Sequence, residues 1–373
     1  MRLERVEAAD PRDVLRAVRG AVLGAGPAIA LGGGDLPFEV PAGTALVVTT
    51  SGSTGVPKSV ALSRSALTAS AMATAARIGE GHWLLPLSGG TIAGIQVMVR
   101  ALVAGRDPAI LAGRFSAPAF AHAASGMRST VGGERIPTFT SLVPAQLLTL
   151  VDAAEEAPPV AQALASFEAI LVGGQRLPDV LRERALALGA RLVRTYGSTE
   201  TSGGCVYDGA PLDDVRVEVV DGELRIAGPH LADGYLGDPD RTAAAFVVDA
   251  SGMRWYRTGD AGSVADGRVR VTGRIDNVIV SGGVNVSLDR VEAIVREVPG
   301  LADAVLVPAP HPRWGEVPVI VTASRVEALG AARAAVEREL GAPGRPDRVV
   351  RVATIPRLAS GKPDRRALRA RVI

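Results

Sequence analysis

The stretch Thr49-Thr50-Ser51-Gly52-Ser53-Thr54-Gly55-Val56-Pro57-Lys58 decides how this chain is organised. The apolar run from Ala45 to Thr50 predicts a short buried strand that leads into the loop. Hydroxyls and backbone N–H groups of the loop can form a nest for phosphate oxygens, its two glycines allow close approach, and Lys58 supplies charge. It is not a Walker A loop, because Pro57 precedes the lysine. A hydroxyl-rich surface turn is the alternative interpretation.

Lysine is rare in this chain. Of 41 basic residues, 39 are arginine, and the two lysines are Lys58 and Lys362. Both lie in Gly/Ser-rich turns of the kind that handle phosphate, where a compact ammonium on a flexible stem differs from a planar guanidinium. Compositional drift is the alternative, but the two positions favour a chemical role for both lysines.

The composition restricts the class of protein. With 373 residues the chain fits two or three domains, and its 47% apolar content suffices for large cores. The net charge of +2 comes from interspersed acids and bases, which argues against a nucleic-acid partner. The single cysteine, Cys205, excludes an internal disulfide and fits a reducing compartment. We expect no signal peptide and no membrane insertion, and therefore a cytoplasmic location.

The order of predicted elements indicates an α/β fold. Strands and helices alternate through about residue 205, which is typical of a doubly wound parallel sheet. Short alternating strands at 212–275 predict a small β subdomain with hairpin turns at Asp221-Gly222 and Asp266-Gly267. A mixed α+β pattern returns from residue 278. We expect a boundary near Arg274–Asn277, where a hinge would lie.

Two further turns carry carboxylates. Glu200, in the motif YGSTE at 196–200, follows a predicted strand and is suited to hold Mg²⁺ bound to phosphates, although a helix-capping glutamate is the alternative. Asp260, in WYRTGD at 255–260, is suited to bind ribose hydroxyls, although aspartate is also an ordinary turn residue.

Taken together, these segments resemble the adenylate-forming acyl-CoA synthetases. The matching motifs are TTSGSTGVPK, YGSTE, WYRTGD, GRIDNVIVSGGVNV and PRLASGKPDR, which span residues 49–365. The resemblance implies an N-terminal adenylation domain at 1–274 and a mobile C-terminal domain at 275–373. It also implies two half-reactions at one site, with ATP, Mg²⁺ and coenzyme A as cofactors.

The resemblance assigns roles residue by residue. Lys362 would catalyse adenylation together with Glu200 and Thr54, Glu200 would bind the metal, and Asp276 would be the hinge. The residues expected to bind ATP are Thr50, Ser51, Gly52, Ser53, Thr54, Gly55, Lys58, Gly173, Gly174, Gln175, Thr195, Tyr196, Gly197, Ser198, Thr199, Asp260 and Arg274.

Within that superfamily the chain is most similar to the o-succinylbenzoate–CoA ligases of menaquinone biosynthesis, in their short actinobacterial form. The similar segments include 85–87, 92–97 with Arg100, 141–146 and 200–208. The resemblance places Arg100 at the site of the aryl acid, and a lone arginine on an apolar helix requires an anion. Pairing with an internal aspartate, or extension to water, is the alternative.

The residues expected to line the acyl pocket are Arg100, Thr91, Gly94, Ser141, Gly203 and Cys205. We interpret Cys205 as a packing residue, because no acid or histidine adjoins it in the sequence. The family usually has histidine where this chain has Thr91, which leaves the identity of the acid open. The segment before the phosphate loop is also unusually short, so part of the N-terminal subdomain is expected to be reduced.

Three functions remain open at this point. The first is an ATP-dependent ligase for o-succinylbenzoate or another aryl acid, and the second is a free-standing adenylating enzyme that loads a carrier protein. The third, a non-catalytic nucleotide-binding relative, is disfavoured because Lys58, Lys362, Glu200 and Asp260 are all present. The expected partners are the small-molecule substrates, and a homodimer is neither indicated nor excluded.

Overall fold

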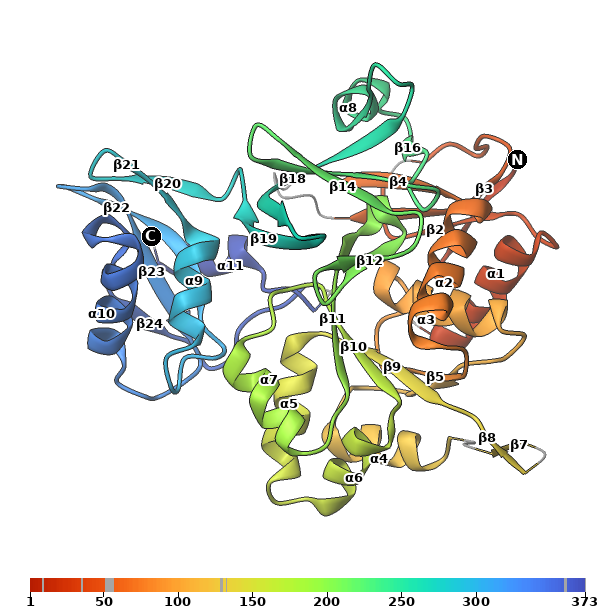
Figure 1. The fold of residues 1–373 in the computed structure, drawn as a ribbon, viewed down its shortest axis with the longest axis horizontal. Helices are drawn as coiled ribbons and strands as arrows, with labels where there is room; N and C mark the ends of the chain where they lie inside the picture. Colours follow the sequence, from red (N-terminus) through yellow and green to blue (C-terminus); the bar gives the residue numbers. More distant parts are fainter. Residues whose placement is uncertain are drawn as a thin grey trace.

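The structure is a computed structural model, and it describes residues 1–8, 10–34, 36–50, 57–127, 130–131, 133–358 and 361–372. Figure 1 shows a large body that contains the N-terminus and a smaller lobe with the C-terminal segment beside it. Among the described residues no helix is long and apolar enough to cross a membrane.

The first sheet contains β3 and β4, the strands that precede and follow residues 51–57 in the chain. Its strand order is β1-β2-β3-β4-β16, and β1, β2 and β3 are parallel whereas β4 pairs antiparallel with β3 and with β16. The strand bounds are β1 Leu3–Val6, β2 Ala28–Leu31, β3 Thr44–Thr50, β4 Lys58–Ser63 and β16 Gly234–Tyr235.

The second sheet is the doubly wound one that the sequence predicted. Its order is β13-β12-β11-β10-β9-β5-β6. The five strands β6, β5, β9, β10 and β11 are parallel to one another, whereas β12 pairs antiparallel with β11 and with β13. The bounds are β5 His82–Leu85, β6 Ala109–Ile110, β9 Thr138–Leu142, β10 Ala169–Val172, β11 Leu192–Ser198, β12 Gly203–Tyr207 and β13 Ala210–Pro211.

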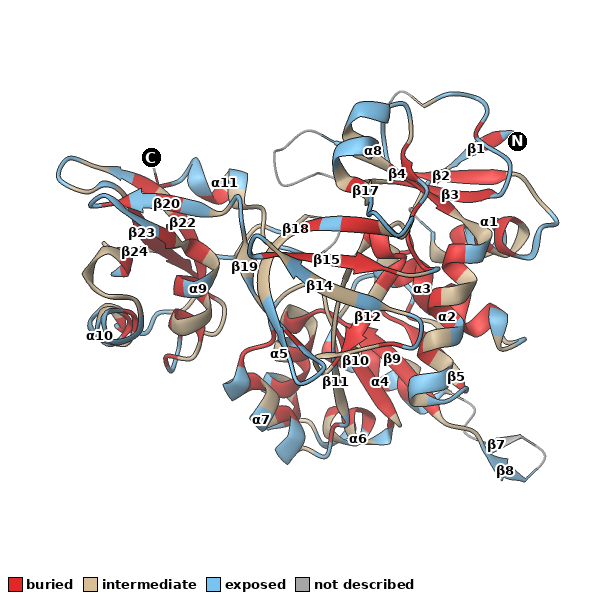
Figure 2. Cartoon of the chain, turned by 45° about the horizontal axis from the view of Figure 1, so that its top comes forward, coloured by how far each residue is buried: buried red, intermediate tan, exposed pale blue. Residues whose placement is uncertain are grey.

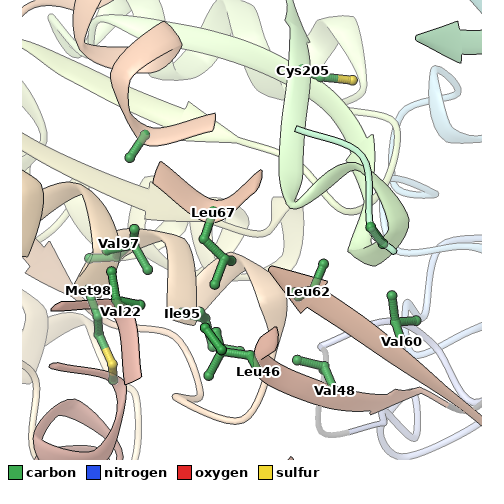
Figure 3. Packing of buried hydrophobic residues seen from close by; sticks show 14 of the residues in the cluster. Val22, Leu46, Val48, Val60, Leu62, Leu67, Ile95, Val97, Met98 and Cys205 are labelled. Carbon is green, nitrogen blue, oxygen red and sulfur yellow. The ribbon is translucent and has the colours of Figure 1, made fainter. Parts of the chain in front are cut away.

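Helices cover both faces of this second sheet. Between the two sheets lie α1 (Pro11–Leu23), α2 (Arg64–Ile78) and α3 (Ile92–Val103), and their apolar side chains share one core with both sheets. Figure 3 shows part of that core, in which Leu46, Leu67 and Ile95 meet. The other face carries α4 Ala117–Ser125, α5 Pro144–Ala154, α6 Pro158–Ser166 and α7 Asp179–Ala187.

A third sheet forms the predicted β subdomain. Its order is β14-β15-β18-β17 with β19 paired to β18, and the turns at Asp221 and Asp266 have the positive φ typical of tight hairpins. The bounds are β14 Arg216–Val220, β15 Glu223–Ala227, β17 Phe246–Val248, β18 Arg254–Ala265 and β19 Arg268–Arg274; α8 is Pro239–Ala245, η1 is Thr199–Thr201, and a separate ribbon joins β7 Thr130–Val131 to β8 Glu134–Arg135.

The segment after residue 274 builds its own sheet and cores. Helices α9 and α10 cover one face, and α11 packs on the other. Figure 2 shows the buried strands of this lobe between exposed helix surfaces. The bounds are β20 Val278–Ser281, β21 Val284–Ser287, α9 Leu288–Arg296, β22 Val305–His311, β23 Gly315–Thr322, α10 Leu329–Leu340, η2 Ala342–Gly344, β24 Val349–Arg351 and α11 Arg365–Arg369.

The α/β class agrees with the sequence prediction. Ser63 precedes α2 and caps it, because its Oγ accepts a hydrogen bond from the N–H of Ala66 at 3.2 Å. One part of the prediction was wrong: the sheet through residue 205 is not parallel throughout. Residues 58–63 form a strand, so the phosphate loop connects an antiparallel hairpin. The division at 274/275 stays a prediction, although β19 ends at Arg274.

Candidate active site

Lys58 is held between a carboxylate and a phenol. Its ammonium forms an ion pair with Glu200, and it donates to the hydroxyl of Tyr235 at 3.3 Å. That hydroxyl in turn donates to Glu200 at 2.9 Å. Lys58 is the first residue of β4, and Tyr235 lies on the adjacent strand β16, so pairing of the two strands brings the groups together.

The predicted phosphate-binding residues Ser51, Gly52, Ser53, Thr54 and Gly55 lie outside the described residues. Thr50 ends β3, and its buried hydroxyl has no hydrogen-bond partner within the described part of the chain. A polar cavity of about 230 Å³ adjoins this end of the hairpin, and it is lined in part by Thr49, Lys58, Ser59, Tyr235 and Arg241. Its size and charge suit phosphate groups.

Glu200 is nearly inaccessible to solvent and is ionised. Burial acts to raise the pKa of its carboxyl, but the charge of Lys58 and hydrogen bonds from Lys58 and Tyr235 outweigh burial and lower it. The residue lies in η1 directly after β11, at the end of a strand where open α/β sheets bind ligands. A single buried carboxylate at this edge can bind a cation that is also held by phosphates.

Seven of the residues expected to bind ATP lie on, or directly after, two neighbouring strands. Gly173, Gly174 and Gln175 follow β10, and Thr195 to Ser198 belong to β11. A Cβ on Gly173 would lie 2.3 Å from the Thr195 hydroxyl, and one on Gly197 would lie 2.0 Å from the carbonyl of Gly203. Only glycine therefore fits at these two positions. Thr199 is buried at the start of η1.

The carboxylate of Asp260 is held by hydrogen bonds from two neighbouring side chains. Its oxygens accept from the hydroxyl of Tyr196 at 2.6 Å and from the guanidinium of Arg274 at 3.2 Å. Asp260 and Arg274 are cross-strand partners on β18 and β19. Burial raises the pKa of Asp260, and the bonds from Tyr196 and Arg274 offset only part of that effect. Arg274 also binds both oxygens of Asp276 at 3.0 and 3.2 Å.

Lys362 reaches the same site from the C-terminal region. Its turn is closed by hydrogen bonds between Leu358 and residues 361 and 362, and Gln175 donates to the carbonyl of Gly361 at 3.4 Å. The side chain keeps an exposed surface, yet the surrounding protein buries it enough to lower its pKa, while Asp260 and Glu200 act to raise it. The turn thus places Lys362 within electrostatic range of Asp260 and of Glu200, the carboxylate that pairs with Lys58.

Arg100 is buried on α3 without a carboxylate partner among the described residues. Its guanidinium donates to the hydroxyl of Tyr207 at 3.2 Å and lies 5.2 Å from the ring centroid of Trp83. Its Nε has no hydrogen-bond partner in the described part of the chain. The Tyr207 hydroxyl is also within 2.9 Å of the hydroxyl of Thr74. Pairing with an internal aspartate, the alternative weighed above, is absent there.

Other buried polar atoms near α3 also lack partners within the described residues. They are the hydroxyls of Ser141 and Ser202 and the side-chain carbonyl of Gln96. Helix α3 packs against β5, β9 and β12, and Ser141 alternates onto the same face of β9 as Phe139, which packs with α3. Buried polar groups are normally paired, so such a group of atoms is typical of a ligand-binding surface.

The remaining predicted acyl-pocket residues have structural roles. Thr91 begins α3: its hydroxyl accepts from the N–H of Gly94 at 3.3 Å and donates to the carbonyl of Ser88 at 2.9 Å. A Cβ on Gly94 would lie 2.1 Å from that carbonyl. Gly203 has a φ of +101°, and a Cβ there would face the side chain of Gln96. Burial raises the pKa of the Cys205 thiol to about 12, which agrees with packing rather than nucleophilic chemistry.

Sequence reasoning missed Tyr235, Tyr207 and Trp83 as members of the site. Tyr207 lies in the segment 200–208 that carried the family resemblance, so its position was visible although its role was not. Tyr235 and Trp83 are aromatic residues whose contacts with Lys58 and Arg100 cross between distant segments. No local pattern predicts such pairs.

Comparison with known proteins agrees with this geometry. Residues 35–236 match the AMP-binding enzyme family, and residues 290–362 match the AMP-binding enzyme C-terminal domain. A probable 2-succinylbenzoate–CoA ligase of Mycobacterium tuberculosis is 39% identical over 338 residues, which cover 87% of this chain and 83% of that protein.

Two solved structures are similar in fold and sequence. The o-succinylbenzoate coenzyme A synthetase of Bacillus subtilis, in complex with AMP, is 26% identical, with a TM-score of 0.71 over 87% of this chain and 69% of that chain. The amide bond synthetase of Marinactinospora thermotolerans is also 26% identical, with a TM-score of 0.74 over 100% of this chain and 80% of that chain. The chain thus belongs to the AMP-binding enzyme family.

Proposed function

We propose that the chain is an AMP-forming acid–thiol ligase that converts o-succinylbenzoate, ATP and coenzyme A to o-succinylbenzoyl-CoA in menaquinone biosynthesis. The observation that carries the choice of acid is Arg100, a buried guanidinium on α3 whose Nε has no hydrogen-bond partner among the described residues. o-Succinylbenzoate has two carboxylates, of which the aliphatic one is activated and the aromatic one must be held. The named relatives from M. tuberculosis and B. subtilis support this choice.

In the first half-reaction an oxygen of the aliphatic carboxylate attacks the α-phosphorus of ATP. A bond forms between that oxygen and phosphorus, the bond to the bridging oxygen breaks, and pyrophosphate leaves. We assign to Lys362 the ammonium that contacts both the carboxylate and the α-phosphate, and the influence of Asp260 and Glu200 on its pKa supports this assignment. Charge stabilisation and positioning carry most of phosphoryl-transfer catalysis.

The site also fits Mg²⁺. Glu200 is buried and ionised, and Mg²⁺ in such sites takes one or two carboxylates together with substrate phosphates. Groups of three or more potential metal ligands are absent from the part of the chain that the structure describes, so phosphate oxygens would supply most of the coordination. When bound, Mg²⁺ supplies charge neutralisation for the phosphates. Lys58 would then pair with phosphate oxygens rather than with Glu200 alone.

In the second half-reaction the thiol sulfur of coenzyme A attacks the activated carbonyl carbon. A carbon–sulfur bond forms, the bond from carbon to the phosphate oxygen breaks, AMP leaves, and the thiol proton passes to solvent. Cys205 takes no part, because its thiol is buried and protonated. No protein base is required, since the acyl phosphate is already strongly activated.

One set of assays tests this function against its alternatives. Purified protein receives ATP, Mg²⁺ and o-succinylbenzoate, with and without coenzyme A, and both AMP and thioester are measured. We expect AMP and thioester in equal amounts when coenzyme A is present. Amide formation with an added amine would instead favour the chemistry named for the amide bond synthetase of Marinactinospora thermotolerans, to which this chain is similar in fold. Adenylate without thioester would favour transfer to a carrier protein.

Location and assembly stay predictions from sequence. We propose a cytoplasmic enzyme, supported by the single buried cysteine, whose thiol has no partner for an internal disulfide. Light scattering of the purified protein would decide whether it is a monomer or a homodimer.

A further inference from the structure

Helix α9 of the C-terminal region contacts the N-terminal region near its first turn. Asp289 accepts a hydrogen bond from the backbone N–H of Arg274 at 2.8 Å and another from the side-chain amide of Asn277 at 2.7 Å. Arg274 ends β19 and also binds Asp260 in the candidate active site. This contact therefore fixes one end of α9 beside the expected hinge.

A second contact lies at the opposite end of the same helix. Glu297 directly follows α9, and its carboxylate accepts from the backbone N–H groups of Asp179 at 3.1 Å and Val180 at 3.3 Å. These N–H groups begin α7 of the N-terminal region, and the guanidinium of Arg176 lies 3.8 Å from the same carboxylate. Pro178, at the start of α7, has no side-chain hydrogen bond to the helix. Glu297 thus supplies the cap that α7 lacks.

The middle of α9 contacts the segment that follows Lys362. Glu292 accepts from the guanidinium of Arg365 at 2.7 Å, and Arg365 also donates to the carbonyl of Leu306 at 2.6 Å. Arg365 begins α11, three residues after Lys362. The position of α9 therefore helps to determine the position of the Lys362 turn. That turn contacts Gln175 through the carbonyl of Gly361.

We propose that Glu297 is a positioning residue for adenylate formation, and the proposal rests on the function proposed above. A contact at Asp289 alone leaves the C-terminal region free to rotate about the hinge. Glu297 adds a second contact about 12 Å away, since eight residues of helix separate it from Asp289. Two contacts at that separation fix the direction of α9, and with it the position of the Lys362 ammonium over the candidate site. Glu297 itself lies far from the reacting atoms.

The test uses the full chain with the variants Glu297→Ala and Glu297→Lys, and Glu339→Ala as the matched control. Glu339 is an exposed glutamate on α10 of the same region. We expect single-turnover adenylate formation to fall about 3- to 10-fold in Glu297→Ala. The fall should exceed about 10-fold in Glu297→Lys, where the new charge faces Arg176 and the positive end of α7. Thioester formation from preformed acyl-adenylate should not change, and loss of the cap should lower the melting temperature by at most a few degrees.

Amide hydrogen exchange gives a readout that needs no acid or coenzyme A. The N–H groups of Asp179 and Val180 should exchange faster in both Glu297 variants than in the wild type and in Glu339→Ala. Equal losses in the two half-reactions with a much lower melting temperature would overturn the proposal, because Glu297 would then serve folding. Unchanged exchange would also overturn it. A wild type that forms no adenylate from o-succinylbenzoate would refute the proposed function, and exchange alone would then decide whether Glu297 docks the two regions.

Discussion

Replacing Arg100 by methionine should separate substrate binding from stability. The guanidinium is buried, it has no carboxylate partner among the described residues, and its Nε is unpaired there. A substrate carboxylate held by this group would gain charged hydrogen bonds worth about 1.5–3 kcal/mol. Losing them corresponds to an increase of about 10- to 150-fold in the KM for o-succinylbenzoate. The KM for ATP should stay nearly unchanged.

The Arg100→Met variant should bind the acid more weakly, but its folded state should be at least as stable as that of the wild type. A buried charge without a counter-ion is unfavourable, and apolar replacements of buried charged groups are often neutral or stabilising by about 1–4 kcal/mol. Methionine fills a similar volume beside Trp83, and the Tyr207 hydroxyl keeps its contact with Thr74 at 2.9 Å. We therefore expect a melting temperature equal to or above that of the wild type.

Steady-state kinetics and thermal melting of Arg100→Met, Arg100→Lys and Tyr207→Phe test this reasoning. Arg100→Lys should recover only part of the affinity, since a point charge cannot reproduce a bidentate fork. Tyr207→Phe should raise the KM by a few-fold, because it removes the hydroxyl that orients the guanidinium. A lower melting temperature together with a higher KM for ATP would mean that Arg100 is structural. A wild-type preference for a monoacid such as benzoate would refute the carboxylate-binding role.

Four further outcomes are expected. Lys362→Ala should abolish adenylate formation but largely spare thioester formation from preformed acyl-adenylate, and equal loss of both half-reactions would contradict its assigned role. Asp276→Pro should permit adenylation and block thioester formation, because proline fixes φ at the expected hinge; Asp276→Ala separates this effect from loss of the Arg274 ion pair. Burial lowers the pKa of Lys362, although Asp260 and Glu200 oppose it, so adenylation should decline as the pH rises through a value below 10.5; a decline that persists in Lys362→Arg would assign the titration to another group. Alkylation of Cys205 in the native protein should be very slow at neutral pH and leave activity intact, since burial raises its thiol pKa to about 12; rapid inactivation by iodoacetamide would disprove the packing role.

Much of the fold followed from local patterns in the sequence. The run from Ala45 to Thr50 lies in the predicted strand, β3, and Asp221-Gly222 and Asp266-Gly267 form the predicted hairpin turns, because apolar runs and turn residues act over a few residues. The strand at 58–63 was missed, since a polar start and a preceding proline hide a short antiparallel strand next to a loop. Its pairing with β3 depends on the whole sheet.

The sequence by itself determined which chemical groups the site would contain: two lysines in a chain of arginines, and carboxylates at Glu200 and Asp260 in recognisable turns. Only the tertiary structure decided how they meet. Lys58 pairs with Glu200 through strand neighbours far apart in the chain, and Glu297 caps a helix of the other region. These contacts depend on distance and burial between segments, and neither quantity is encoded in the local spacing of residues.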